Sequence, residues 1–374
     1  MLHLQDPSYS DSYSLHEAMI NVCSSAESGS GAYAFVSKSG VDLLFRDIEF
    51  ERLFDRGGYQ LVVGIDQITN TITINRLMEY EKIYSSLRVR AFLHDTNNSL
   101  FHPKLSYFSG ENGSGSLIIG SGNLTAGGLR RNREAFAVID LSEQELINID
   151  AYWNDWIDQS ACFLRPLADQ DVISRVAENT IRAKAWKDIS IPEVGPMDVD
   201  GISVASETMD ESHEWNYQDS NLVLFAEIPR SGDRWNQANF DVNTFQSFFG
   251  ATVGDNSQRI LLRSVESERV LGDVEIRPSV SVRSHNYRFE LEAAAGLSYP
   301  VSGRPIGLFV RLSTRMFIYM IFMPNTGGKY DEIVDWMNAN WEGRSDRMKR
   351  IVVAAHDVFH ILEDTPLNSF LVTQ

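Results

Sequence analysis

Residues 101–134 read FHPKLSYFSGENGSGSLIIGSGNLTAGGLRRNRE, and this stretch decides the fold and chemistry predicted for the first half of the chain. His102 and Lys104 stand two positions apart, so both side chains would project from the same face of an extended strand. Four side chains would occupy the opposite, buried face: Phe101, Pro103, Leu105 and Tyr107. The pattern predicts a strand that presents a histidine and a lysine together.

A glycine-rich turn with polar side chains follows this strand. Gly120-Ser121-Gly122-Asn123 carries a hydroxyl and an amide, and its glycines allow the backbone to approach a ligand closely. Glu134 follows Asn123 by 11 residues. A phosphodiester is negatively charged, so its cleavage needs an uncharged nucleophile with cationic or hydrogen-bonding support. The stretch supplies these groups and therefore predicts phosphodiester chemistry.

His102 is the candidate nucleophile, because an imidazole with its ordinary pKa near 6.5 is largely uncharged at neutral pH. Attack by one ring nitrogen requires the proton on the other, and a carboxylate that accepts this proton's hydrogen bond fixes the tautomer. Glu134 is the candidate for that role. Lys104, Ser121 and Asn123 would hold the non-bridging oxygens of the substrate. Three arginines would add positive charge for a polyanion: Arg130, Arg131 and Arg133.

These residues resemble the half-motif of the phospholipase D superfamily, His-x-Lys-x4-Asp-x6-Gly-Ser-x-Asn. The matching positions are His102, Lys104, Gly120, Ser121 and Asn123, with Glu134 beyond them. Ser109 stands where the motif has its Asp, Glu111 is the nearest carboxylate, and the interval before Gly120 is longer than usual. Many single-motif nucleases of the superfamily lack that Asp, so the resemblance favours a nuclease over a lipase.

The resemblance implies a reaction without metal or cofactor that passes through a covalent phosphohistidine, which water then resolves. Acidic residues and histidines with the spacing of a two-metal nuclease are absent from the sequence. Superfamily members pair two His-x-Lys motifs, one histidine attacking and the other protonating the leaving group. The remaining histidines have no lysine two positions on: His3, His16, His94, His213, His285, His356 and His360. We therefore expect a homodimer whose two-fold axis completes one composite active site.

Length and composition bound the alternatives. A chain of 374 residues with 43% hydrophobic residues favours two globular domains. A net charge of −18 argues against a protein that coats nucleic acid non-specifically, so a DNA-binding face would need locally concentrated positive charge. The sequence has no apolar run of the roughly 18 residues that span a membrane and no signal-peptide pattern at its start. Two cysteines do not form a disulfide framework, so cytoplasm is the default compartment.

Hydrophobic periodicity predicts alternating strands and helices in the first half of the chain. Strands are expected at 31–37, 59–66, 88–94, around His102, 115–122 and 134–140, and helices at 14–24, 41–56, 69–87, 141–160 and 173–190. Threonines at the start of 69–87 are candidate helix caps. The alternation indicates an α/β layer with a mostly parallel sheet. The resemblance implies a phospholipase D-like mixed sheet with flanking helices, a nuclease and dimerisation domain over residues 1–190.

Residues 191–220 are rich in proline, glycine, serine and acidic residues without a clear period, which predicts an acidic interdomain linker. One interpretation is a solvated connector. The other is a regulatory segment whose carboxylates lie in the DNA cleft and suppress cleavage until cognate DNA displaces them.

Residues 221–374 consist mainly of short strand patterns with turn signals between them, which indicates a barrel or sandwich. Two polar loops carry side chains able to recognise bases. The first contains Arg230, Arg234, Trp235, Asn236, Gln237 and Asn239, and the second contains Arg283, Ser284, His285, Asn286, Tyr287 and Arg288. The alternatives are ordinary polar turns, or packing of Trp235 and Arg234 at the domain interface. A basic cluster near the end is either a helix surface or a phosphate clamp: Arg344, Arg347, Lys349 and Arg350.

The order of strands and loops in 221–374 resembles the recognition domain of some phospholipase D-type restriction endonucleases, which is related to the DNA-binding pseudobarrel of plant transcription factors. This resemblance implies a mainly-β pseudobarrel with short helices that binds double-stranded DNA. The expectation is a sequence-specific restriction endonuclease of a restriction-modification system in phage defence. The sequence has no Gly-x4-Gly-Lys-Ser/Thr loop, so any ATPase or translocase would be a separate subunit. The alternatives are a lipid or small-molecule phosphodiesterase and a catalytically silent DNA-binding scaffold.

Overall fold

The computed structural model describes residues 1–66, 68–94, 99–189, 213–230, 235–252, 255, 257–267, 270–278, 280–281, 287–324, 328–344 and 347–372. These residues form two compact units. Unit 1 contains Met1–Asp6 and Tyr13–Glu214, and unit 2 contains Pro7–Ser12 and Trp215–Gln374. Most of the predicted acidic linker, residues 191–212, lies outside the described residues.

Unit 1 contains an eight-stranded mixed sheet with the strand order β1-β7-β6-β5-β2-β3-β4-β8. Its strands are β1 (Leu2–Gln5), β2 (Ala26–Tyr33), β3 (Tyr59–Gly64), β4 (Leu87–Phe92), β5 (Lys104–Gly110), β6 (Gly115–Gly120), β7 (Glu134–Leu141) and β8 (Leu164–Arg165). Only β2, β3 and β4 run parallel to one another, and the other pairs are antiparallel. The expected mostly parallel sheet is therefore wrong, because β5, β6 and β7 follow one another without the helical crossovers that parallel strands need. The expected mixed α/β sheet with flanking helices is confirmed.

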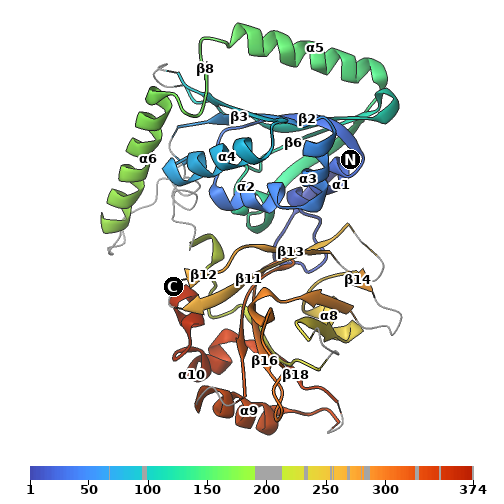
Figure 1. Ribbon diagram of the computed structural model, residues 1–374, viewed down its shortest axis with the longest axis vertical. Coiled ribbons are helices and arrows are strands. Elements are labelled where there is room, and N and C mark those ends of the chain that lie inside the picture. Colours follow the sequence, from blue (N-terminus) through green and yellow to red (C-terminus); the bar gives the residue numbers. More distant parts are fainter. Residues whose placement is uncertain are drawn as a thin grey trace. The chain divides into compact units, whose positions relative to one another are not determined.

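Helices cover both faces of this sheet, with α1 to α4 on one face and α5 on the other (Figure 1). The helices are α1 (Leu15–Cys23), α2 (Lys38–Phe45), α3 (Ile48–Arg56), α4 (Thr71–Ile83), α5 (Glu143–Gln159) and α6 (Gln170–Ile189), with short turns η1 (Glu111–Gly113) and η2 (Gly127–Arg131). The single helix expected over 41–56 is two helices, because Asp47 caps a new start by accepting from the Glu49 amide. Asn70, rather than a threonine, caps α4.

Unit 2 contains two sheets and short helices. Its elements are η3 (His213–Trp215), β9 (Leu222–Glu227), β10 (Gln237–Phe240), α8 (Val242–Ser247), β11 (Arg259–Ser267), β12 (Val270–Leu271), β13 (Glu275–Pro278), β14 (Val280–Ser281), β15 (Tyr287–Glu290), η4 (Glu292–Ala294), β16 (Ile306–Ser313), β17 (Met316–Phe322), α9 (Gly328–Asn340), β18 (Arg350–Ala354), η5 (Ala355–Val358), α10 (Phe359–Leu362) and η6 (Pro366–Phe370). One sheet has the order β10-β15-β14, and the other β12-β11-β17-β16-β9-β18 with β13 on β11. Within the described ranges these strands do not close into a ring.

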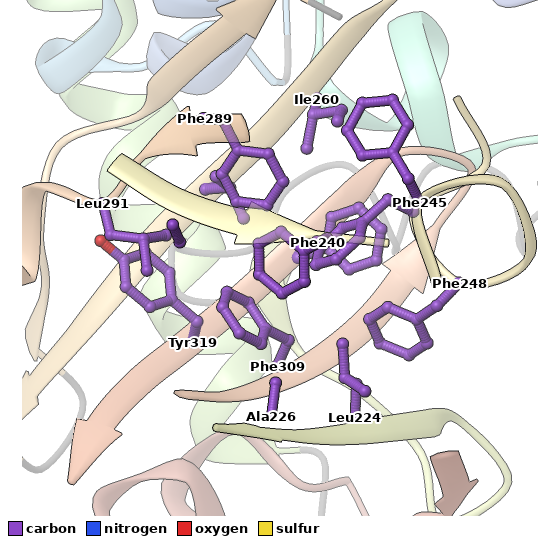
Figure 2. Packing of buried hydrophobic residues seen from close by; sticks show 14 of the residues in the cluster. Leu224, Ala226, Phe240, Phe245, Phe248, Ile260, Phe289, Leu291, Phe309 and Tyr319 are labelled. Carbon is purple, nitrogen blue, oxygen red and sulfur yellow. The ribbon is translucent and has the colours of Figure 1, made fainter. Parts of the chain in front are cut away.

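An aromatic core holds unit 2 together. Figure 2 shows Phe240, Phe289 and Phe309 grouped with Tyr319, and Phe249 belongs to the same buried cluster. The ring of Phe249 has tilted or edge-on contacts with several of its neighbours, the geometry that aromatic pairs prefer. This core explains why short strands with few residues each form a stable unit.

Residues 7–12 near the start of the chain pack within unit 2, which the sequence did not predict. Arg315 has a φ of 56° in the turn between β16 and β17, and its side chain is almost completely buried. Its Nη1 donates to the carbonyl oxygens of Ser10 and Gly250, both at 2.8 Å, and its Nη2 donates to Ser12 at 2.6 Å. One buried guanidinium therefore fixes this segment.

The described end of the predicted linker, residues 213–220, is folded. Trp215 is fully buried under the guanidinium of Arg263, whose carbon lies 5.1 Å from the ring centre. Tyr217 is also buried and pairs with Leu371 through a β-bridge. These residues belong to a core rather than to a solvated connector.

Candidate active site

The candidate site lies at one edge of the unit 1 sheet, where β2 and β6 end and β5 and β7 begin. β5 runs antiparallel to β2 and to β6, and β6 runs antiparallel to β7, so these four ends meet at the same edge. His102 lies just before β5 rather than inside it, and the pairing continues because the Ala34 amide donates to the Pro103 carbonyl at 2.8 Å. The register thus brings residues far apart in sequence to one place.

His102 and Lys104 form the centre of the site. The Lys104 Nζ lies 3.1 Å from His102 Nδ1 and 2.9 Å from Nε2. An ammonium only donates, so it bonds to whichever ring nitrogen carries no proton. The Phe35 ring lies edge-on to His102 at 5.7 Å, and the Lys104 Nζ is 5.9 Å from the same ring's centre. The predicted presentation of both side chains together is therefore present in the structure.

The environment of His102 favours an uncharged imidazole. Partial burial lowers the pKa of His102 below its ordinary value, and the positive charge of Lys104 lowers it further. The side chain remains exposed at the sheet edge. His102 therefore combines access to solvent with the protonation state that a nucleophile requires.

Ser121 and Glu134 lie together at the ends of β6 and β7. The Ser121 hydroxyl donates to the Glu134 carboxylate and accepts from the Ala135 amide at 3.0 Å. Asn132 Nδ2 donates to the other Glu134 oxygen at 3.2 Å. In the described part of the chain these are the hydrogen bonds of the Glu134 side chain, and none of them joins it to His102. Its role in fixing the tautomer of His102 stays a prediction.

Asn123 is nearly buried in the turn beyond β6. The amide of the next residue, Leu124, donates to the carbonyl of Phe35 at 3.1 Å, which joins the turn to the segment that follows β2. Two glycines make this arrangement possible and were not singled out from the sequence. A Cβ on Gly40 would lie 2.2 Å from the Leu124 carbonyl oxygen, and one on Gly128 would lie 2.4 Å from that of Asn123. Backbone atoms that close leave no room for a side chain at either position.

A buried polar network of Arg130, His16 and Glu17 packs behind this turn. Arg130 lies in the π-helical turn η2, is completely buried, and donates from Nη2 to His16 Nδ1 at 2.9 Å and from Nη1 to Glu17 Oε1 at 3.3 Å. His16 Nε2 lies 2.7 Å from the Leu43 carbonyl. A guanidinium only donates and a carbonyl only accepts, so the His16 proton resides on Nε2.

The network changes the role expected for the three arginines. Arg130 is not available to a polyanion, because its charge is inside unit 1. Arg131 is partly buried and donates to the Glu214 carbonyl, and burial lowers the pKa of its guanidinium. Only Arg133 has a largely exposed side chain, and it pairs with Asp6 at 3.2 Å. Of the positive charges expected to attract DNA in this part of unit 1, only those of Arg133 and Lys104 are accessible.

A second histidine lies at the same sheet edge, beyond the ends of β3 and β4. His94 Nε2 is 3.2 Å from Asp66 Oδ2, and Arg175 Nη1 is 3.3 Å from Asp66 Oδ1. This cluster could not be predicted from the sequence, because Asp66, His94 and Arg175 are far apart in the chain and have no motif spacing. It provides further polar side chains at the edge that holds His102.

The residues predicted to bind DNA differ in their exposure. Trp235 is wrong as a base contact, because its ring is buried in the unit 2 core and its Nε1 donates to the Leu297 carbonyl at 2.6 Å. Arg230 and Arg288 are exposed, whereas Gln237 donates to Glu290 at 2.8 Å. Asn236 and Asn239 are partly buried. Four further residues lie outside the described part of the chain: Arg234, Arg283, His285 and Asn286.

The described ranges hold neither a membrane-spanning helix nor a metal-binding group of side chains. None of the helices there combines the length and the hydrophobicity needed to cross a bilayer. Within the same ranges, no three side chains of His, Cys, Asp or Glu group in a way that would hold a metal ion.

Comparisons with known proteins give structural likenesses only. No family model and no curated protein matches the sequence. Nuc from Salmonella typhimurium, a phospholipase D family member, is 18% identical with a TM-score of 0.33, over 44% of this chain and 97% of that one. NucT from Helicobacter pylori is 14% identical with a TM-score of 0.30, over 44% and 98%. Phosphatidylserine synthase from Haemophilus influenzae is 14% identical with a TM-score of 0.34, over 50% and 46%. At these values, function has to be inferred from the chemistry of the site itself.

Lys104→Gln is expected to raise the pKa of His102 toward its ordinary value, because the substitution removes the neighbouring positive charge. Titration of the histidine side chains by NMR measures this shift. Lys38→Gln, a lysine that pairs with Asp42 elsewhere in unit 1, is the matched control and should leave His102 unchanged. An unchanged or lower pKa of His102 in Lys104→Gln would show that the two groups do not interact in solution.

Arg130→Ala is expected to lower the free energy of unfolding by about 3–5 kcal/mol, because it leaves the buried Glu17 carboxylate without its cation. Arg52→Ala removes an exposed arginine that pairs with Glu49, and should cost no more than about 1 kcal/mol. Urea unfolding of the full chain compares the two. Equal losses in both variants would contradict a supporting role for the network.

Proposed function

We propose that the chain is a phosphodiesterase that cleaves DNA, with His102 as the nucleophile. The observation that carries the proposal is an exposed imidazole whose pKa is lowered by burial and by the Lys104 ammonium, which lies within 3.1 Å of both ring nitrogens. An uncharged nucleophile beside a fixed cation is what attack on an anionic phosphodiester demands. The resemblance of the sequence to the phospholipase D half-motif supports the same assignment.

The proposed reaction has two steps. In the first, the Lys104 ammonium moves from the unprotonated ring nitrogen of His102 to the phosphate oxygens, and that nitrogen forms a bond to phosphorus. The bond from phosphorus to the leaving oxygen breaks, and that oxygen takes a proton from a second imidazole. In the second, water loses a proton to that second group and attacks phosphorus, which breaks the phosphorus–nitrogen bond and regenerates His102. Lys104 stabilises the negative charge on the non-bridging oxygens through both steps.

The Ser121 hydroxyl and the Asn123 amide are proposed to bind the non-bridging oxygens with Lys104. In the unliganded structure Ser121 donates to Glu134, so substrate binding has to redirect that hydrogen bond. Once Ser121 turns to the phosphate, Glu134 is free to accept from an imidazole, either that of its own chain or that of a partner. This exchange reconciles the tautomer-fixing role with the observed hydrogen bonds.

The second imidazole is proposed to come from a second copy of the chain. His94 is held by Asp66, which also pairs with Arg175, and His16 is completely buried with Arg130. Neither His94 nor His16 is therefore proposed as the proton donor for the leaving group. A homodimer with an isologous interface at this sheet edge would supply His102 of the other copy.

Unit 2 is proposed to recognise double-stranded DNA, in the arrangement of a pseudobarrel. Arg230 and Arg288 are exposed, and arginine reads guanine in the major groove. We infer a sequence-specific restriction endonuclease acting without metal in the cytoplasm, in a restriction-modification system that defends against phage. A separate ATPase subunit remains compatible with this proposal.

Plasmid cleavage in EDTA tests the proposal. We expect nicking or linearisation by the wild-type chain without divalent ions, and a loss of roughly a thousand-fold or more in His102→Ala. His360→Ala, which removes an exposed histidine of unit 2, is the matched control and should cleave normally. Activity that requires Mg²⁺ and survives His102→Ala would overturn the mechanism, and headgroup release from vesicles without DNA cleavage would favour a lipid phosphodiesterase.

A further inference from the structure

A groove of ≈ 730 Å³ opens on unit 2, lined by β10, α8, the segment after α9 and β18. These elements can be located in Figure 1 by the labels α8, α9 and β18. The side chains that matter for its chemistry are Asn239, Asn243, Trp341, Arg344, Arg347 and Arg350. The volume falls within the roughly 300–1,000 Å³ of sites that bind small organic ligands.

The groove concentrates positive charge in a chain whose net charge is −18. Three arginines line it, and Arg344 and Arg347 are exposed. Asp241 is the single acidic residue among the described residues that line it. Its carboxylate caps α8, accepting from the Thr244 amide at 2.9 Å and the Thr244 hydroxyl at 2.8 Å. The groove therefore favours an anion.

Arg350 is a third, partly buried arginine in the wall of the groove. Its Nη1 donates to the Lys349 carbonyl at 3.1 Å and to the Glu227 carbonyl, and its Nη2 donates to the Asn239 carbonyl at 3.1 Å. Burial lowers the pKa of Arg350 to about 10, which still leaves it charged at neutral pH. Within the described residues none of its hydrogen bonds reaches a carboxylate. The carboxylates of Asp241 and Glu227 oppose that lowering, so Arg350 keeps its charge and adds to the positive potential of the groove.

Trp341 gives the groove an aromatic wall. Its Nε1 donates to the Arg344 carbonyl at 3.1 Å, which fixes the ring next to the exposed arginine. Gly343 packs so closely that a Cβ there would lie 2.2 Å from a ring carbon of Trp341. Nucleobases stack on aromatic rings of this kind, and the amides of Asn239 and Asn243 are suited to hydrogen-bond a base edge.

We propose that this groove binds one unstacked nucleotide of a DNA strand, with its phosphate on Arg344 and Arg347 and its base against Trp341. The proposal rests on the proposed function in one respect, that DNA is the ligand of the chain. A paired base has to leave the helix to reach the ring, and it does so most easily at a mismatch. Unit 2 would thus grip DNA partly through a nucleotide that has left the base stack.

Binding of full-length His102→Ala to fluorescein-labelled DNA tests the proposal, because this variant leaves the DNA intact. Fluorescence anisotropy in EDTA compares a fully paired duplex with the same duplex carrying one mismatch. We expect the mismatched duplex to bind about ten-fold more tightly, and Trp341→Ala to abolish that preference. Joint replacement of Arg344 and Arg347 by alanine should weaken both complexes and reduce the slope of log affinity against log salt by about two.

Lys329→Ala is the control, since it removes a positive charge of unit 2 that pairs with Glu332 outside the groove. It should retain both the salt slope and the mismatch preference. Equal affinities for paired and mismatched DNA, or groove variants that behave like Lys329→Ala, would overturn the proposal while leaving the nuclease function intact. If the His102→Ala chain binds no DNA of either kind, the groove and the proposed function fail together.

Discussion

The buried ion pair between Arg130 and Glu17 is the interaction on which the candidate site depends. A charge inside a protein is tolerated only when its partners satisfy it, so the guanidinium fixes the positions of everything it bonds to. His16 and Glu17 come from α1, and Arg130 comes from the turn just after Asn123. The network therefore holds the turn that contains Asn123 against helix α1. Single π-helical turns are uncommon and occur frequently at functional sites, and η2 follows the turn of the candidate site.

The buried Arg130 network holds the backbone of the turn, so the side chains of the candidate site can be exposed. His102 and Ser121 are exposed at the strand ends that form the candidate site, and Lys104 is partly buried beside them. Their backbones are held by strand register, by the Leu124 bridge to β2's extension and by glycines at positions 40 and 128. This division between a buried charged support and an exposed reactive edge is the basis of the proposed mechanism.

Local patterns in the sequence predicted most of the elements of unit 1 and the pairing of His102 with Lys104. The direction of the strands was not predictable in the same way, because alternating strands and helices before β5 favoured a parallel sheet while the later strands add antiparallel. Trp235 illustrates another limit: a tryptophan in a polar loop has the same local sequence whether it contacts DNA or the core, and burial against the aromatic cluster decided for the core. Arg130 likewise looked like a surface charge, since its partners His16 and Glu17 lie more than a hundred residues earlier. The segment 7–12 joins unit 2 through Arg315 for a similar reason, a long-range contact without a local signal.

Transfer of DNA phosphate to the protein is the measurement that tests the central claim most directly. The chain is mixed with DNA carrying radioactive phosphate, the reaction is stopped with detergent at neutral pH, and the labelled peptide is mapped. The account predicts label that is stable in base and labile in acid, attached to the peptide containing His102 and missing in His102→Ala. Acid-stable label on Ser121, or DNA cleavage without any labelled protein, would contradict it.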